Sequence, residues 1–151
     1  AFLAAQRATP LDRHLITKAY RALEGTDPLS NATPDHGFHQ TIVEASHNPV
    51  LVHVLSGLKN MMLLTVQAAV SNLNPRTEMR KTIERQHRQL FHAVVSSKPA
   101  AARRIATSHV RFVSQALKEM EQQGAPVIRA PVTPATGTPE HTGIDFRRHS
   151  P

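Results

Sequence analysis

Apolar positions recur along the chain with helical spacing, and proline, glycine and asparagine divide the pattern into segments. Residues 9–12 read Thr-Pro-Leu-Asp. This predicts a helix start, because Thr is a good N-cap, Pro suits the first helical position and an acid is favourable in the first turn. We expect this helix to reach Leu23 and to stop at Gly25, with a loop over 25–34. Residues 2–5 resemble the end of an earlier helix, so the first helix is expected to be truncated and the chain to be part of a longer protein.

The remaining breaks are three X-Pro pairs, which disfavour helix at the residue before proline, and Gly124, a natural residue to follow a helix C-terminus. They delimit four more predicted helices, at 35–47, 49–72, 76–96 and 98–123. The helix at 49–72 is expected to be the most buried, because its apolar positions cover more than a narrow stripe. The sequence shows no strand alternation and no internal repeat. The predicted fold class is therefore all-α, an antiparallel bundle of about five to six helices joined by short turns.

Composition bounds the domain organisation and the class of protein. The 151 residues are enough for one domain, which we place at 1–123, and the proline-rich stretch at 124–151 is expected to be a flexible tail that cannot build a core. The absence of Cys excludes a disulfide scaffold and a thiolate metal site. The sequence has neither an apolar run near the ~20 residues of a membrane span nor a secretory signal pattern. A soluble cytoplasmic protein with no membrane partner is expected.

The net charge of +7 comes from 18 Lys and Arg against 11 Asp and Glu. Ten of these basic residues and four of the acidic ones lie between residues 76 and 123, so the excess falls on two predicted helices. The sequence holds one Tyr, no Trp and no Gly-rich stretch, so no base-stacking platform or phosphate loop accompanies the charge. We therefore interpret the charge as a solvated helix face rather than a nucleic-acid site.

Two of the ten histidines lie where a helix should be apolar. His87 is in the middle of the apolar stripe of the helix at 76–96, and His109 is in the middle of the stripe of the helix at 98–123. His87 lies 11 residues before Lys98, and His109 lies 11 residues after it. An antiparallel hairpin that turns at Lys98 therefore brings the two imidazoles to the same level, facing the core.

A carboxylate and a third imidazole share another inward face. Asp35 and His39 are spaced i, i+4, and this face continues through Ile42. If they converge with the two core histidines, the buried polar atoms need a partner, and a divalent cation provides one. Nitrogen ligands with one oxygen suit zinc first, with nickel or manganese as alternatives, and argue against calcium. From spacing alone, ordinary core histidines bonded to backbone or water remain the alternative. The other histidines show no matching pattern and are interpreted as structural or exposed: His14, His36, His47, His53, His92, His141 and His149.

The segments around these residues carry a family resemblance. Asp35-His36-Gly37-Phe38-His39, the boundary Ala45-Ser46-His47-Asn48-Pro49 and the two later histidines, taken in this order, resemble the effector (FCD) domain of the FadR-type branch of the GntR transcription regulators. The resemblance covers roughly residues 1–123. Within the family, the run from His109 to Lys118 and the polar tail after it are most similar to repressors of lactate utilisation that respond to L-lactate.

The resemblance implies a dimeric helical bundle in which Asp35, His39, His87 and His109 hold a metal. It also implies a small carboxylate effector that completes the coordination and changes how paired N-terminal winged helix-turn-helix domains meet operator DNA. The chain departs from the family in two ways: the DNA-reading domain is absent, and the family's effector-binding Arg would fall just before Ala1. L-lactate or a similar 2-hydroxy acid is the expected effector, because its carboxylate and hydroxyl can reach one metal together; glycolate or a sugar acid is the alternative.

Asn60 and Gln67 are polar residues in the otherwise apolar helix at 49–72, and they are further candidates for effector binding. A partly exposed face of that helix explains them equally well. Two other classes of protein stay open. A mononuclear metalloenzyme would need a general base, and no further carboxylate lies on an inward stripe, so an enzyme is not expected. A purely structural dimerisation module is the other class.

Overall fold

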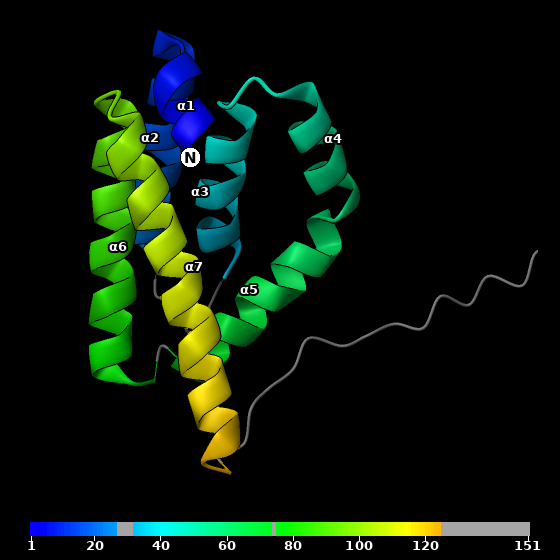
Figure 1. Ribbon diagram of the computed structural model, residues 1–151, viewed down its shortest axis with the longest axis vertical. Coiled ribbons are helices and arrows are strands. Elements are labelled where there is room, and N and C mark those ends of the chain that lie inside the picture. Colours follow the sequence, from blue (N-terminus) through cyan, green and yellow to red (C-terminus); the bar gives the residue numbers. More distant parts are fainter. Residues whose placement is uncertain (27–31, 74, 125–151) are drawn as a thin grey trace, which may run out of the picture.

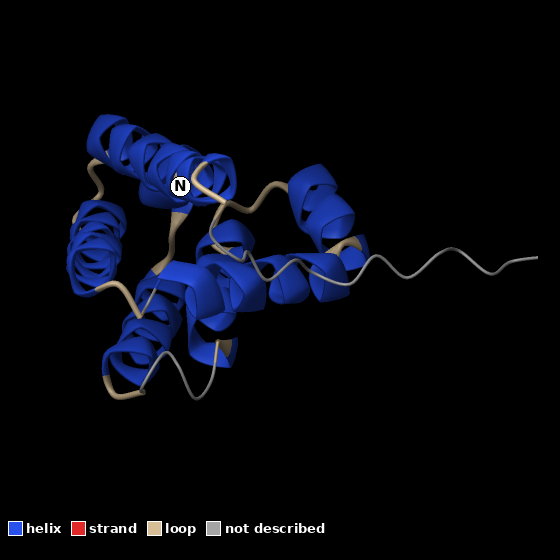
Figure 2. Cartoon of the chain, turned by 90° about the horizontal axis from the view of Figure 1, so that it is seen from below, coloured by secondary structure: helices blue, strands red, loops and turns tan. Residues whose placement is uncertain are grey.

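The computed structural model describes residues 1–26, 32–73 and 75–124, and this part of the chain contains helices and no strand (Figures 1 and 2). The predicted all-α class is confirmed. Seven helices are present in the described ranges, more than the five to six expected, because the predicted helix at 49–72 is divided in two. In chain order the helices are α1 (Phe2–Arg7), α2 (Pro10–Glu24), α3 (Thr33–Glu44), α4 (Pro49–Gly57), α5 (Lys59–Leu73), α6 (Thr77–Val95) and α7 (Pro99–Gln122).

The predicted start of α2 is confirmed in atomic detail. The Thr9 hydroxyl accepts a hydrogen bond from the Asp12 backbone N–H at 3.2 Å, and the Asp12 carboxylate accepts one from the Thr9 backbone N–H at 2.7 Å. This reciprocal pair is a capping box. Gly124 follows α7 with φ +71°, the left-handed conformation expected of a residue that ends a helix. The rest of the predicted tail, 125–151, lies outside the described residues, as do residues 27–31 of the predicted loop.

Two apolar clusters hold the bundle together, and they lie toward opposite ends of the α6–α7 hairpin. The first joins α1, α2 and α3 to the end of α6 and the start of α7, and it includes the buried Ile16, Phe38 and Val94. The second joins the end of α5 to the start of α6 and the later part of α7 around Leu73 and Met120. The middle of the α6–α7 hairpin therefore lies between the two apolar clusters.

Arg13 of α2 ties down the turn between α6 and α7. Its Nη1 donates to the carbonyl oxygen of Val95 at 2.8 Å, and its Nη2 donates to the Ser97 hydroxyl, also at 2.8 Å. Ser97 itself has φ +52°, a left-handed conformation that costs energy for a residue with a side chain. Because this turn sets the register of α6 against α7, the arginine helps to fix the level at which their side chains meet.

The predicted helix at 49–72 is not continuous, and the expectation that it is the most buried helix is wrong. Helical geometry stops at Gly57, and Leu58, with φ −97° and ψ 7°, separates α4 from α5, which are bent by 70° relative to each other. No residue of α4 is buried, and in α5 only Val70, Asn72 and Leu73 are. The bend carries α4 away from the bundle (Figure 1). Apolar residues on all faces of this helix therefore do not lead to its burial.

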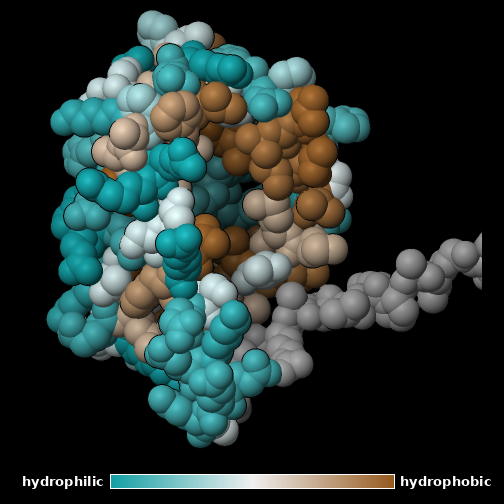
Figure 3. Space-filling model, viewed as in Figure 1, coloured by the Kyte–Doolittle hydropathy of each residue, from teal (hydrophilic) through white to brown (hydrophobic). Residues whose placement is uncertain are grey.

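The divided helix leaves apolar side chains on the surface. Val50, Val54 and Met61 are each more than half exposed, and Figure 3 shows hydrophobic side chains gathered over α4 beside a hollow in this face of the molecule. Among the described residues, no single helix is long and apolar enough to cross a membrane. Only α4 and α5 taken together, as a bent pair, reach that length and composition.

Candidate metal centre and adjoining cavity

Three imidazoles from three helices meet between the two apolar clusters. His39 comes from α3, His87 from α6 and His109 from α7, and one nitrogen of each lies within 4.8 Å of the others. The Nε2 atoms of His39 and His87 are 3.2 Å apart. The rings of His87 and His109 are 4.7 Å apart between centroids, so the hairpin brings them to one level, as their equal spacing from Lys98 predicts.

Asp35 adds a carboxylate to this group. Its Oδ1 lies 3.5 Å from Nε2 of His39, one helical turn along α3, and its Oδ2 lies 3.7 Å from Nε2 of His87. The side chains of Asp35 and His87 are 15% and 4% exposed, so these polar atoms are largely removed from water. All four side chains that the resemblance implies as metal ligands are thus adjacent in the structure. We call Asp35, His39, His87 and His109 the Asp–His group.

Gln86 orients one of these rings. Its side-chain oxygen contacts Nδ1 of His109 at 3.0 Å, and both residues are buried. An amide oxygen only accepts hydrogen bonds, so the contact requires the hydrogen of His109 on Nδ1 and leaves the lone pair on Nε2. This is the arrangement by which an outer partner fixes a histidine for metal binding.

Burial controls the protonation of the Asp–His group. It lowers the pKa of His39 to about 4, helped by the nearby ring of His36, and it lowers the pKa of His109 to about 4, helped by His39. Burial also holds the pKa of His87 well below 6.5. Burial raises the pKa of Asp35 to about 6, although His109 and His36 act in the opposite direction. Near neutral pH the three imidazoles are therefore neutral, which is the form that binds metals.

The spacing of these atoms fits a metal ion. Ligand atoms about 2.0–2.1 Å from a tetrahedral zinc ion lie roughly 3.3–3.4 Å from one another. The 3.2 Å between the nitrogens of His39 and His87, and the 3.5 and 3.7 Å to the Asp35 oxygens, lie close to this value. Three neutral nitrogens with one carboxylate oxygen form a donor set suited to zinc, nickel or manganese.

A cavity of about 530 Å³ adjoins the Asp–His group. Asp35, His39 and His109 form part of its wall, so the group opens onto space large enough for a small organic molecule. Most of the remaining wall is apolar and comes from α3, α5, α6 and α7. Among the described residues that line this cavity, no Lys or Arg side chain is present.

The structure does not bring Asn60 or Gln67 to this cavity. Both are exposed on α5. They are seven residues apart and so share one face of the helix, whereas the cavity face lies on the opposite side. The α5 residues that line the cavity are Met62, Thr65, Val66, Ala69 and Val70.

Two residues beside the group were missed by sequence reasoning. Gln86 precedes His87 directly, and a glutamine at the edge of an apolar stripe carries no distinctive pattern. His36 was interpreted as structural or exposed, but it is 6% exposed and lines the cavity. Its position three residues before His39, and therefore on an adjoining face of α3, is the one signal that could have indicated it.

Comparison with known proteins supports the resemblance. Residues 1–112 match the FCD domain family. The "Glc operon transcriptional activator" of Escherichia coli K12 is 40% identical over 139 residues, which cover 87% of this chain and 55% of that protein. The "Putative L-lactate dehydrogenase operon regulatory protein" of the same strain is 28% identical over 125 residues, 83% of this chain and 48% of that protein. The chain thus spans about half the length of these relatives, whose names describe regulators of operons.

Proposed function

The chain belongs to the FCD domain family, and from this premise we propose that it is the metal-dependent, carboxylate-sensing domain of a GntR-type transcriptional regulator. The observation that carries the proposal is the meeting of Asp35, His39, His87 and His109, the first, second and fourth of which line a cavity. Zinc is the metal we propose first, with nickel or manganese as alternatives.

The effector we propose is a short 2-hydroxy acid. A metal held by the Asp–His group in the cavity wall offers a positive charge to the carboxylate. A carboxylate oxygen and the neighbouring hydroxyl oxygen can reach one cation from the same side. Four protein ligands leave room for them only if the coordination number rises to five or six. L-lactate and glycolate are the first compounds to test, with sugar acids after them.

Effector binding would act on helix packing. The Asp–His group joins α3, α6 and α7, so a ligand that binds one arrangement of these helices more tightly shifts the population toward it. In the proposed whole protein, a homodimer, this shift is passed to the N-terminal DNA-binding domains that meet the operator. A regulatory role requires no general base, and we therefore favour it over a metalloenzyme.

Metal analysis and calorimetry with L-lactate and glycolate test the proposal. We expect about one divalent metal per chain and effector binding that depends on it. His87→Ala should remove metal and effector binding together, while His92→Ala, an exposed histidine on the same helix, should change neither. A purified chain without metal, or effector affinity unchanged in His87→Ala, would contradict the sensor. Turnover of a bound acid would favour the enzyme instead.

The DNA-binding part of the proposal has its own test. The isolated chain should give no sequence-selective shift of operator DNA that survives added salt, because its positive face provides only screened, sequence-independent attraction. A protein that also carries the N-terminal domain should give such a shift and should respond to the effector. Light scattering on both proteins measures the proposed homodimer.

A further inference from the structure

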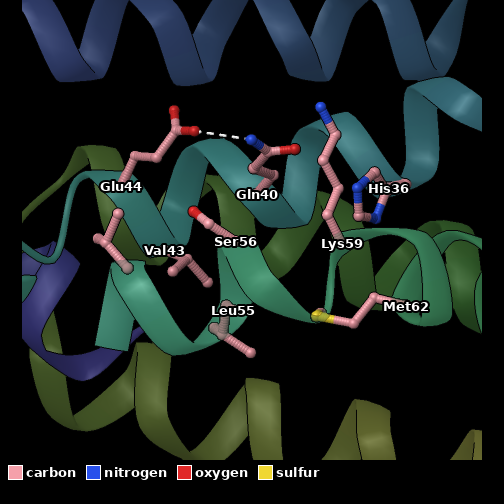
Figure 4. A pocket seen from close by; sticks show the side chains of 9 residues that line it. His36, Gln40, Val43, Glu44, Leu55, Ser56, Lys59 and Met62 are labelled. Atoms are coloured by element: carbon pink, nitrogen blue, oxygen red, sulfur yellow. Dashed lines mark hydrogen bonds between the residues drawn. The ribbon is translucent and has the colours of Figure 1, made fainter. Parts of the chain in front are cut away.

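His36 is a buried polar residue whose side chain has no hydrogen-bond partner within the part of the chain that the structure describes. It is 6% exposed, and neither Nδ1 nor Nε2 makes a hydrogen bond. An imidazole without partners in a low-dielectric site costs free energy, so such a group usually has a partner in water or a ligand. The ring lines the 530 Å³ cavity and also a small cavity of about 30 Å³ between α3 and the α4–α5 segment (Figure 4).

The other polar side chains of the large cavity are differently placed, and one of them, Ser114, is exposed. Asp35, His39 and His109 belong to the Asp–His group. The Thr65 hydroxyl already donates to the carbonyl oxygen of Met61 at 2.9 Å. His36 is therefore the described lining residue that combines burial with two unused hydrogen-bonding atoms.

The position of His36 on α3 puts it next to the Asp–His group. It directly follows Asp35 and lies three residues before His39, and residues three apart are neighbours on a helix surface. A molecule of two or three carbon atoms bound to a metal at His39 would therefore have His36 within reach along the same helix.

We propose that His36 is a carboxylate-binding residue of the cavity, donating a hydrogen bond to the carboxylate oxygen of the effector that does not bind the metal. This inference rests on the proposed function. A neutral imidazole has one N–H to donate to that oxygen, and its second nitrogen can accept from a water molecule. The small cavity has room for about two or three water molecules, since each needs roughly 10–15 Å³.

The assignment predicts the same loss of affinity for every carboxylate, because all carboxylates have the oxygen concerned. His36→Phe keeps a ring of similar size and removes the donor. It should weaken the binding of L-lactate and of propionate by the same factor. We expect the affinity for each acid to fall by about 10- to 100-fold, the effect of losing a hydrogen bond to a charged group. His36→Gln retains an N–H donor and should recover part of the affinity. Zinc affinity should stay unchanged in both variants.

The measurement is calorimetric titration of the zinc-loaded chain with each acid, in displacement mode where binding is weak, with zinc affinity measured separately. Gln67→Leu is the control, since Gln67 is exposed on α5 and does not line the cavity; the affinity for both acids should stay unchanged. Thermal unfolding checks that each variant is folded. If His36→Phe does not fold, His36→Leu, which also removes the donor, takes its place. A loss confined to L-lactate, or no loss for either acid, overturns the assignment.

The outcomes separate this inference from the function on which it rests. Wild-type protein that binds no zinc or no carboxylate overturns the proposed function and the role of His36 with it. Wild-type protein that binds both, with unchanged acid affinity in His36→Phe, overturns only the role of His36. A fall in zinc affinity in His36→Phe would show that the residue supports the metal ligands rather than the acid, which also contradicts the proposal.

Discussion

The side-chain oxygen of Gln86 accepts a hydrogen bond from Nδ1 of His109 at 3.0 Å, and both residues are buried. This contact fixes the ring tautomer and leaves the lone pair on Nε2 available to a metal. Gln86→Leu removes the acceptor and leaves the ring free to turn. We expect zinc affinity to fall by about 10- to 100-fold, the usual effect of removing such an outer partner.

Competition titration with a chromogenic zinc chelator measures this change. Gln89→Leu provides the control, because Gln89 is exposed on the same helix and should leave zinc affinity unaltered. Equal zinc affinity in Gln86→Leu and wild type would mean that His109 is oriented by its packing alone, or that it is not a ligand.

Metal removal should destabilise the protein. Between the apolar clusters, Asp35 and three imidazoles are brought together at a cost in desolvation, which a cation offsets. Zinc at 100 times its dissociation constant should stabilise the chain by about 2.7 kcal/mol. Differential scanning calorimetry with zinc and with chelator measures the effect. His87→Ala should make the two melting temperatures converge, and the same gap in His87→Ala as in wild type would exclude the Asp–His group as the zinc site.

The capping box at the start of α2 should make part of the stability depend on pH. Burial alone would raise the pKa of Asp12, but hydrogen bonds from Thr9 and His47 outweigh it, and the pKa lies below its ordinary value of 3.8. A carboxyl whose pKa is lower in the folded state binds protons more weakly there than in the unfolded chain. Its contribution to stability is therefore present above about pH 4 and is lost as pH falls through the lowered pKa.

Asp12→Ala tests this contribution. The variant should be less stable than wild type by about 1 kcal/mol at pH 7, the usual effect of losing a helix cap, and the difference should shrink toward pH 3. Urea unfolding of chelator-treated protein at several pH values gives both numbers. Glu78→Ala, which removes an exposed ion pair with Lys81, should show a smaller effect. A difference for Asp12→Ala that grows as pH falls would contradict the lowered pKa of this carboxyl.

Local signals in the sequence predicted much of this structure. The Thr-Pro-Leu-Asp start of α2 and the glycine after α7 depend on contacts within a few residues, so their rules hold without knowledge of the rest of the fold. The level of His87 and His109 depends only on equal spacing from one turn. Partners that meet through tertiary packing could not be predicted in the same way: nothing in sequence joins Gln86 to His109, 23 residues away.

The helix at 49–72 shows the opposite case. Its apolar composition indicates that these side chains are buried against some surface. Composition does not say whether that surface belongs to this bundle or to another molecule. The bend at Leu58 decides this, and it directly follows the Ser56-Gly57 pair, a combination at which helices kink, with no proline at the break. The prediction that Asn60 and Gln67 line the cavity failed for a related reason. Which face of α5 points inward depends on how this helix packs against its neighbours, and the sequence does not show that.

Two leucines of this segment test the bend directly. Leu73, at the end of α5, is fully buried in the second apolar cluster, whereas Leu58 is 41% exposed. Leu73→Ala should therefore reduce stability by about 2–5 kcal/mol, and Leu58→Ala should cost well under half as much, because little of its side chain leaves water on folding. Urea unfolding of both variants at one protein concentration measures the contrast. Equal losses would mean that residues 49–72 form one buried helix, or that another surface covers Leu58 in solution; repeating the measurement at tenfold lower concentration separates these, since only an intermolecular contact weakens on dilution.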